Sequence, residues 1–218
     1  MSIYKDISFL NNPDDQQDGP EFMPLLSLEE EDEMNKESTP ESLPILPLRN
    51  TVMFPGVVFP ITVGRDKSIK LIKDANASNK IIGVVAQTDS GIEDPEFKDL
   101  YKVGTVATIL KTLRMPDGNT TVIIQGKKRF TLGEMISDEP YFKAQIHSFA
   151  EVETPNDDSF KATISSIKDM ALRIIDLSPN IPSEASFAIK NIDSPNFLIN
   201  FISSNLNIDV KEKQKILE

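Results

Sequence analysis

Residues 43–72 read LPILPLRNTVMFPGVVFPITVGRDKSIKLI, and this stretch decides the expected fold of the chain. Apolar residues dominate 44–49 and again 57–63, and such short runs are typical of β-strands. Pro60 cannot donate a ladder hydrogen bond, so the second strand is expected at a sheet edge or a bulge. The prolines and the glycine of 51–56 favour a loop. The stretch therefore predicts two short strands joined by a surface loop.

The following residues, up to 153, add further short strands and one helix. Apolar spacing predicts an amphipathic helix over 66–77. Other apolar runs predict strands at 80–87, 103–113, 120–124, 128–135 and 141–152. The sequence PDGN at 116–119 is a turn signal that predicts a hairpin between two of these strands. Many short strands with a single helix favour a small barrel over a parallel sheet.

Residues 154–218 change to helical spacing. Thr154 and Pro155 are expected to cap and open a helix. Its apolar stripe consists of Phe160, Ile164, Ile167, Ala171 and Ile174. Further helices are expected to open at Pro182, at Ser194-Pro195 and after Asp209. No capping signal closes the last helix before Glu218, so we expect the natural chain to continue beyond this residue.

Charge is distributed unevenly along the chain. Residues 1–42 hold 12 acidic residues and two lysines, a net charge of −10, whereas the whole chain carries −11. This segment has few periodic apolar residues, so we expect a disordered acidic leader over 1–42. The remaining body is close to neutral and lacks the positive charge that nucleic-acid binding requires.

The composition also bears on the compartment. The chain has no cysteine, which excludes disulfides, thiolate zinc sites and a cysteine nucleophile and fits a reducing compartment. No run of about 18 apolar residues occurs, and the start MSIYKDISFL lacks the pattern of a secretory signal. We therefore expect a cytoplasmic protein that does not span a membrane.

No motif for catalysis, cofactor binding or metal binding is found. His147 is the sole histidine and has no nucleophile or orienting acid near it in the sequence. The only Gly-Lys pair, Gly126-Lys127, is followed by lysine instead of serine or threonine, so it is no phosphate-binding loop. The basic run Lys127–Arg129 must alternate faces on a strand and lacks an aromatic platform, which disfavours RNA binding. We expect no catalytic residue, cofactor, metal or nucleic-acid site in this chain.

Apolar residues of the 51–56 loop are the remaining functional signal. Loops lie on surfaces, so Met53 and Phe54 are expected to be exposed. Methionine adapts to many apolar partners. We therefore predict a contact patch for unfolded polypeptides, formed by Leu48, Met53, Phe54, Pro60, Leu113 and Met115. The alternative is that these side chains plug the end of the barrel.

The opening stretch resembles the start of the N-terminal region of Lon-type ATP-dependent proteases, which typically reads LPxLPLRxxVxFPxxxxPxxVGRxxSxxxx. The matching residues are Leu43, Pro44, Leu46, Pro47, Leu48, Arg49, Pro55, Pro60, Val63, Gly64, Arg65 and Ser68. Later segments also resemble the family: VVAQ at 84–87, DLYKVGTVATILKTLRMPDG at 99–118 and VIIQGKKRF at 122–130. The resemblance covers residues 43–218.

This resemblance implies an α+β fold, with a PUA-like β pseudo-barrel and one short helix over 43–153 and a small helical bundle over 154–218. It implies the substrate-recognition region of a homohexameric serine protease that has a Ser–Lys dyad and an AAA+ domain. Those catalytic domains, with ATP and Mg²⁺, are expected downstream in the same polypeptide and not in this chain. The expected partners are unfolded or damaged proteins and degrons.

Two alternatives stay open. The first is a standalone Lon-like adaptor or ligand-binding domain without protease activity, which the reading frame beyond Glu218 would separate from the main hypothesis. The second is an RNA-binding PUA-like module, which salt-dependent retention on RNA would support.

Overall fold

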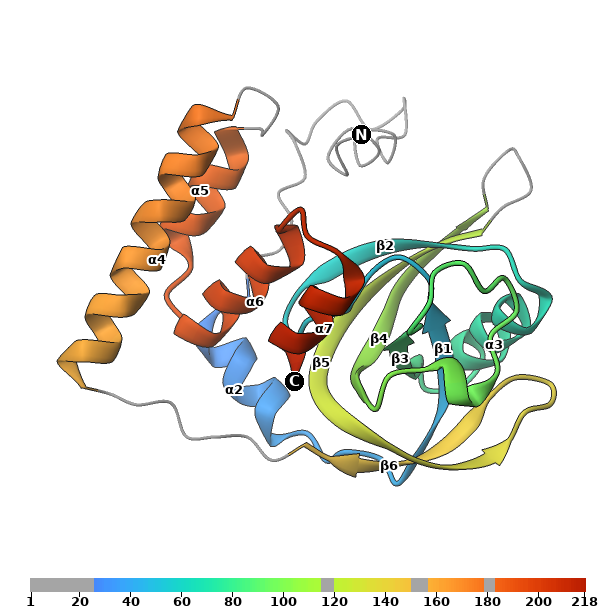
Figure 1. The fold of residues 1–218 in the computed structure, drawn as a ribbon. Helices are drawn as coiled ribbons and strands as arrows, with labels where there is room; N and C mark the ends of the chain where they lie inside the picture. Colours follow the sequence, from blue (N-terminus) through green and yellow to red (C-terminus); the bar gives the residue numbers. More distant parts are fainter. Residues whose placement is uncertain (1–25, 115–119, 150–156, 179–182) are drawn as a thin grey trace, which may run out of the picture. The chain divides into compact units, whose positions relative to one another are not determined.

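Figure 1 shows the computed structural model of the chain, which describes residues 26–114, 120–149, 157–178 and 183–218. The chain divides into two compact units. The sheet unit comprises Leu28–Val152 with Ile199–Glu218, and the helical unit comprises Met1–Ser27 with Glu153–Leu198. These units differ from the predicted domains because the sheet unit also takes in a helix before the first strand and the last helix of the chain.

Six strands of the sheet unit form one sheet that closes on itself. They are β1 (Ser42–Leu48), β2 (Val58–Val63), β3 (Ile81–Ala86), β4 (Val103–Arg114), β5 (Thr120–Ser137) and β6 (Lys143–Ser148). Their order is β2-β5-β4-β3-β1-β6, and β5 also pairs with β6, so five strands form a ring. The β1–β3 pairing is parallel and the others are antiparallel. The α+β class is confirmed, whereas the PUA-like assignment stays a prediction.

Two clusters of buried side chains hold this sheet together. One cluster includes Leu46 and receives the helix α3 (Asp66–Asn76) through its buried residues Leu71, Ile72 and Ala75. The other cluster surrounds Phe130 and includes Ile45. The neighbours Ile45 and Leu46 belong to different clusters because successive side chains of a strand point to opposite faces. The predicted helix over 66–77 is therefore confirmed by both its bounds and its buried face.

Strand β5 is continuous over 18 residues, so the two separate strands predicted at 120–124 and 128–135 are wrong. Gly126 lies inside the ladder, opposite Ala107 of β4. Register shifts on both sides of β5 are typical of bulges, which bend a strand and increase its twist. Residues 120–125 of β5 pair with β2, and residues 130–137 pair with β6. The predicted turn at 116–119 lies outside the described residues.

The helix α2 (Leu28–Lys36) precedes the sheet and is attached to β5 by lysines. Lys128 Nζ donates hydrogen bonds to the backbone carbonyls of Asn35 and Glu37 at the C-terminal end of α2. Lys127 Nζ lies 3.5 Å from the Glu37 carboxylate. Cations at a helix C-terminus satisfy unpaired carbonyls and stabilise the helix dipole. The expected disorder over 1–42 is therefore wrong for α2, while residues 1–25 lie outside the described residues.

The helix α7 (Val210–Leu217) is also attached to the sheet. Gln214 Nε2 donates to the Val103 carbonyl at 2.9 Å, and Arg129 Nη1 donates to the Leu217 carbonyl at 3.1 Å. The start of α7 is capped as predicted, since the Asp209 carboxylate accepts a 2.7 Å hydrogen bond from the Glu212 backbone N–H. Side chains of β5 therefore hold the helices α2 and α7.

The helical unit contains α4 (Asp158–Leu177), α5 (Ser183–Asn191) and the first residues of α6 (Pro195–Asn205). Lys168 of α4 donates hydrogen bonds to the carbonyls of Lys190 and Ile192, at 3.0 and 3.1 Å. Helix α4 is capped by Asp157 and not by Thr154, so it begins later than predicted. The 3₁₀ helix η2 (Phe97–Asp99) of the sheet unit completes the described elements. No helix in the described ranges is long and apolar enough to cross a membrane.

Candidate functional site

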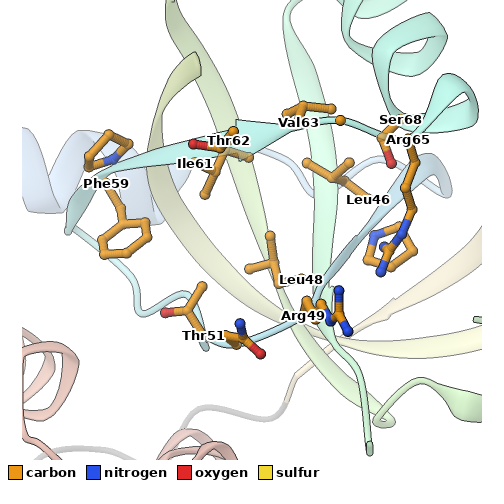
Figure 2. Close-up of a pocket in the computed structure, with 14 residues that line it drawn as sticks. Leu46, Leu48, Arg49, Thr51, Phe59, Ile61, Thr62, Val63, Arg65 and Ser68 are labelled. Carbon is orange, nitrogen blue, oxygen red and sulfur yellow. The ribbon is translucent and has the colours of Figure 1, made fainter. Parts of the chain in front are cut away.

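A cleft of about 500 Å³ opens in the sheet unit between β1 and β2. Within the described residues, β2 pairs only with β5. β1 pairs with β3 over Ile45–Leu48, while β6 covers only Ser42–Pro44 of its other edge. The second half of β1 and the whole of β2 therefore face the cleft with edges that no strand covers. Figure 2 shows apolar side chains of both strands along the opening, among them Leu46, Leu48, Phe59 and Ile61.

A proline interrupts each of these two strand edges. The Leu48 carbonyl accepts a 2.8 Å hydrogen bond from Gln87 next to β3, so by alternation the carbonyl of Pro47 points to the cleft side. The Val57 carbonyl accepts a 3.0 Å bond from Gly126 on β5, which by the same alternation directs the carbonyl of Pro60 to the cleft side. Neither proline has an N–H. The cleft walls therefore offer backbone acceptors, with fewer donors than an ordinary strand edge.

Two arginines close one end of the cleft from opposite walls. Arg49 follows β1 and Arg65 follows β2, and Figure 2 shows their side chains at the same end of the opening. Arg49 Nε donates to the Ser90 carbonyl at 2.6 Å. Arg65 Nε donates to the Glu93 carbonyl at 2.6 Å, and its Nη2 donates to Gln87 Oε1 at 2.7 Å. Both arginines thus hold the loop after β3. Their guanidinium groups have more N–H donors than these hydrogen bonds use.

The two arginines bring positive charge to this end of the cleft, beside the carboxylates of Glu93 and Asp94. Burial lowers the pKa of Arg65, and the like charge of Arg49 lowers it further, although Asp94 and Glu93 act in the opposite direction. Neither arginine forms an ion pair with any side chain of the described residues. Arg65 is also the N-cap residue of α3 and makes no side-chain cap, so the N–H groups of the first turn of α3 add positive potential. An anionic group would be stabilised at this position.

The structure places the residues of the predicted contact patch in different environments. Leu48 and Pro60 line the cleft, on opposite walls. Leu113 is half-buried on β4 and does not line the cleft, and Met115 lies outside the described residues. The described residues of the predicted patch therefore do not form one surface.

The expected exposure of Met53 and Phe54 is wrong, because only 4% and 1% of these side chains are exposed. Thr105 Oγ1 donates a 2.6 Å hydrogen bond to the Met53 carbonyl, and Gly56 N–H donates a 2.9 Å bond to the Gly126 carbonyl. Gly126 has no side chain, so the Phe54 carbonyl lies directly against it. These contacts hold the loop inside the sheet unit. This agrees with the alternative prediction, in which the side chains fill the end of the barrel.

Comparison with known proteins identifies the family. Residues 42–218 match the family model described as the ATP-dependent protease La (LON) substrate-binding domain. The chain belongs to this Lon domain family. The Lon protease of Flavobacterium johnsoniae is 62% identical over 199 residues, and that of Cytophaga hutchinsonii is 50% identical over 199 residues. These matches cover 90% and 91% of this chain but only 24% of each relative, so the chain spans about a quarter of their length.

Solved structures agree on the fold of the Lon domain. The N-terminal domain of a Mycobacterium avium complex Lon protease matches with a TM-score of 0.65 at 21% identity, covering 81% of this chain and 90% of that one. A Lon N-terminal domain protein from Xanthomonas campestris matches with a TM-score of 0.58 at 14% identity, covering 81% and 89%. At these identities the likeness concerns the fold alone.

Exposed apolar residues of this Lon domain occur on α4, where the sequence had predicted a core-facing helix. The exposed fractions of Met170, Ile174 and Leu177 are 58%, 57% and 75%. Their spacing of four and three residues places them along one face. Ile174 had been assigned to the buried stripe, which instead continues at the half-buried Ile175. A second apolar stripe beside the first was the signal that could have found this surface.

The described residues of the Lon domain contain no group of three or more His, Cys, Asp or Glu that could hold a metal ion. His147 is exposed on β6, opposite Thr131 of β5. The apolar cleft and the exposed face of α4 are therefore the features that call for a functional explanation.

Proposed function

We propose that this Lon domain captures unfolded or damaged proteins and their degrons, and that it does so for an ATP-dependent Lon protease. The cleft between β1 and β2 carries the proposal. Phe59 and Pro60 of its lining are only partly buried, whereas Leu46, Leu48 and Ile61 are at most 7% exposed. A polypeptide without tertiary structure presents both apolar side chains and unpaired backbone groups to such a site. A folded protein has already paired most of its backbone and buried most such side chains.

The exposed face of α4 supports the same function as a second apolar contact. Methionine and isoleucine on a helix face bind apolar partners without demanding a fixed geometry. Contacts of this kind are individually weak. Several copies of the domain in a homohexamer would raise the overall affinity by increasing the effective concentration of binding sites.

The remaining parts of the proposal concern the longer protein. The relatives are about four times as long as the matched region, which supports an AAA+ ATPase domain and a Ser–Lys protease domain elsewhere in the same polypeptide. ATP and Mg²⁺ would act there and not in this domain. This length favours the proposal over a standalone adaptor. The engagement of Lys127, Lys128 and Arg129 with protein groups argues against an RNA-binding surface on β5.

Binding to a permanently unfolded protein tests this proposal. The probe is reduced and carboxymethylated α-lactalbumin, titrated with the 218-residue chain. Phe59→Ala removes a large apolar side chain from the cleft and should weaken binding at least about threefold, because apolar burial is lost. Phe97→Ala is the matched control, since Phe97 is also a partly buried phenylalanine of the sheet unit but does not line the cleft.

Unfolding curves of both variants are measured first, so that any loss of structure is separated from a loss of binding. Equal affinity of wild type, Phe59→Ala and Phe97→Ala for the unfolded probe would show that the cleft is not the capture surface. A folded, native α-lactalbumin sample serves as the second probe and should not bind.

A further inference from the structure

The positive end of the cleft is not explained by capture of apolar segments. Arg49 and Arg65 converge there from the two walls, without an ion-pair partner among the described side chains. The pKa of Arg65 is lowered first by burial and then by the like charge of Arg49, while Asp94 and Glu93 act in the opposite direction. A bound anion would relieve the repulsion.

We propose that Arg49 and Arg65 bind the C-terminal carboxylate of a captured polypeptide, whose last residues lie extended between β1 and β2. This inference rests on the proposed function and names the part of the unfolded protein that the cleft receives. The guanidinium groups match a carboxylate in charge and in planar geometry, because arginine donates parallel N–H bonds to the two oxygens.

The position of the arginines favours a chain end over an acidic side chain. Arg49 follows β1 and Arg65 follows β2, and the two strands run in opposite directions, so the two arginines meet through their side chains at the loop after β3. The side chains of an extended peptide project to the two sides of its backbone plane, whereas its terminal carboxylate continues the backbone itself. A carboxylate that ends the peptide at this end of the cleft therefore continues its backbone toward the two guanidinium groups.

The cleft walls are compatible with such a peptide. Its volume of about 500 Å³ is within the usual range of ligand sites. The inward carbonyls of Pro47 and Pro60 accept hydrogen bonds from peptide N–H groups. Because proline has no N–H, the extended peptide would pair with each wall through a few of its own N–H groups and not through a continuous ladder. Apolar side chains of the peptide would contact residues such as Leu48 and Phe59.

Both arginines also hold the loop after β3, and the test must separate this structural role from carboxylate binding. The probes are three N-terminally fluorescent peptides of one apolar sequence, Ala-Val-Leu-Val-Ala. The first has a free C-terminal acid, the second a C-terminal amide, and the third an amide with glutamate in place of the second valine. Fluorescence anisotropy gives the Kd of each for the full 218-residue chain.

The free acid should bind at least about tenfold more tightly than the amide, because a charge-assisted contact with arginine is lost on amidation. Arg49→Gln, which keeps an N–H donor for the Ser90 carbonyl, should reduce this acid-to-amide ratio to about threefold or less. The control Lys98→Gln removes an exposed cation that does not line the cleft and should leave the ratio unchanged. If a variant fails to fold, the acid-to-amide affinity ratio of the unaltered chain still tests the inference.

Three outcomes would overturn the inference: equal affinity of the acid and the amide, an undiminished ratio in folded Arg49→Gln, or a glutamate amide that binds as tightly as the acid. If neither short peptide binds, the inference also fails. In each case the unfolded α-lactalbumin titration decides separately on the proposed function, because that probe measures capture through the apolar walls.

Discussion

Two apolar segments differ from their expected exposure to solvent. One is the loop at 51–57 of the sheet unit, and the other is the helix α4 of the helical unit. The loop was predicted to expose Met53 and Phe54, yet both are buried. Helix α4 was predicted to bury Ile174, yet this residue and its neighbours Met170 and Leu177 are largely exposed. Both segments are rich in apolar residues, so hydrophobicity alone does not distinguish them.

The difference lies in what the backbone of each segment can bond to. A helix satisfies its own backbone hydrogen bonds, so one of its faces can stay exposed without leaving backbone groups unpaired. The loop cannot do so, and its carbonyls and N–H groups find partners at Thr105 and Gly126 inside the sheet unit. Pairing of the loop backbone brings its side chains into the core. Whether a loop residue is buried therefore depends on hydrogen-bond partners that lie far away in the sequence and cannot be recognised from the loop itself.

The largest expected effect is that of Phe54→Ala. Its side chain is among the largest that are fully buried, so the substitution should lower the free energy of unfolding by about 3–5 kcal/mol. Denaturant unfolding monitored by circular dichroism measures this change. If Phe54 were an exposed contact residue, the change would stay within about 0.5 kcal/mol and only binding would suffer.

A smaller effect is expected from Gly126→Ala. The added methyl group would collide with the backbone carbonyl of Phe54, and strand and loop must then separate slightly. We expect a loss of about 1–3 kcal/mol in unfolding free energy, as for other overpacked sites. Gly91→Ala is the control, because the nearest atom there belongs to the movable side chain of Asp89, at 3.0 Å. Equal stability of the two variants would contradict the close packing of the loop on β5.

The smallest expected effect on stability is that of Ile174→Ser on α4. More than half of this side chain is exposed, so the unfolding free energy should change by no more than about 0.5 kcal/mol. Its neighbour Ile175 is half-buried, and Ile175→Ser should cost clearly more. The same denaturation experiment compares the two. A larger cost at Ile174 than at Ile175 would show that the helix presents a different face to its unit.

Local patterns predicted the elements whose stability is local. The spacing of Leu71, Ile72 and Ala75 predicted α3, and the cap at Asp209 predicted α7. Pro60 predicted an edge position for its strand, and β2 pairs only with β5 within the described residues. The start of α4 was misplaced because Asp157 competes with Thr154 for the cap, and aspartate is the stronger N-cap residue.

Features that depend on strand order could not be predicted. Helix α2 needs Lys128, which is more than 90 positions away along the chain. The cleft exists because β1 and β2, although consecutive, pair with different strands. Arg49 and Arg65 were both present among the residues that carry the family resemblance. Their convergence became visible only when the two walls were placed opposite each other.

The single attachment of β2 has a mechanical consequence. Among the residues that the structure describes, β2 forms a ladder with β5 alone and is not paired with β1, so one edge of the strand is held and the other is free to move. Twisting of β5 would widen or narrow the gap without breaking any ladder bond between the walls. A cleft whose width can change accepts both small and large side chains. A domain that binds polypeptides without a common sequence needs this property.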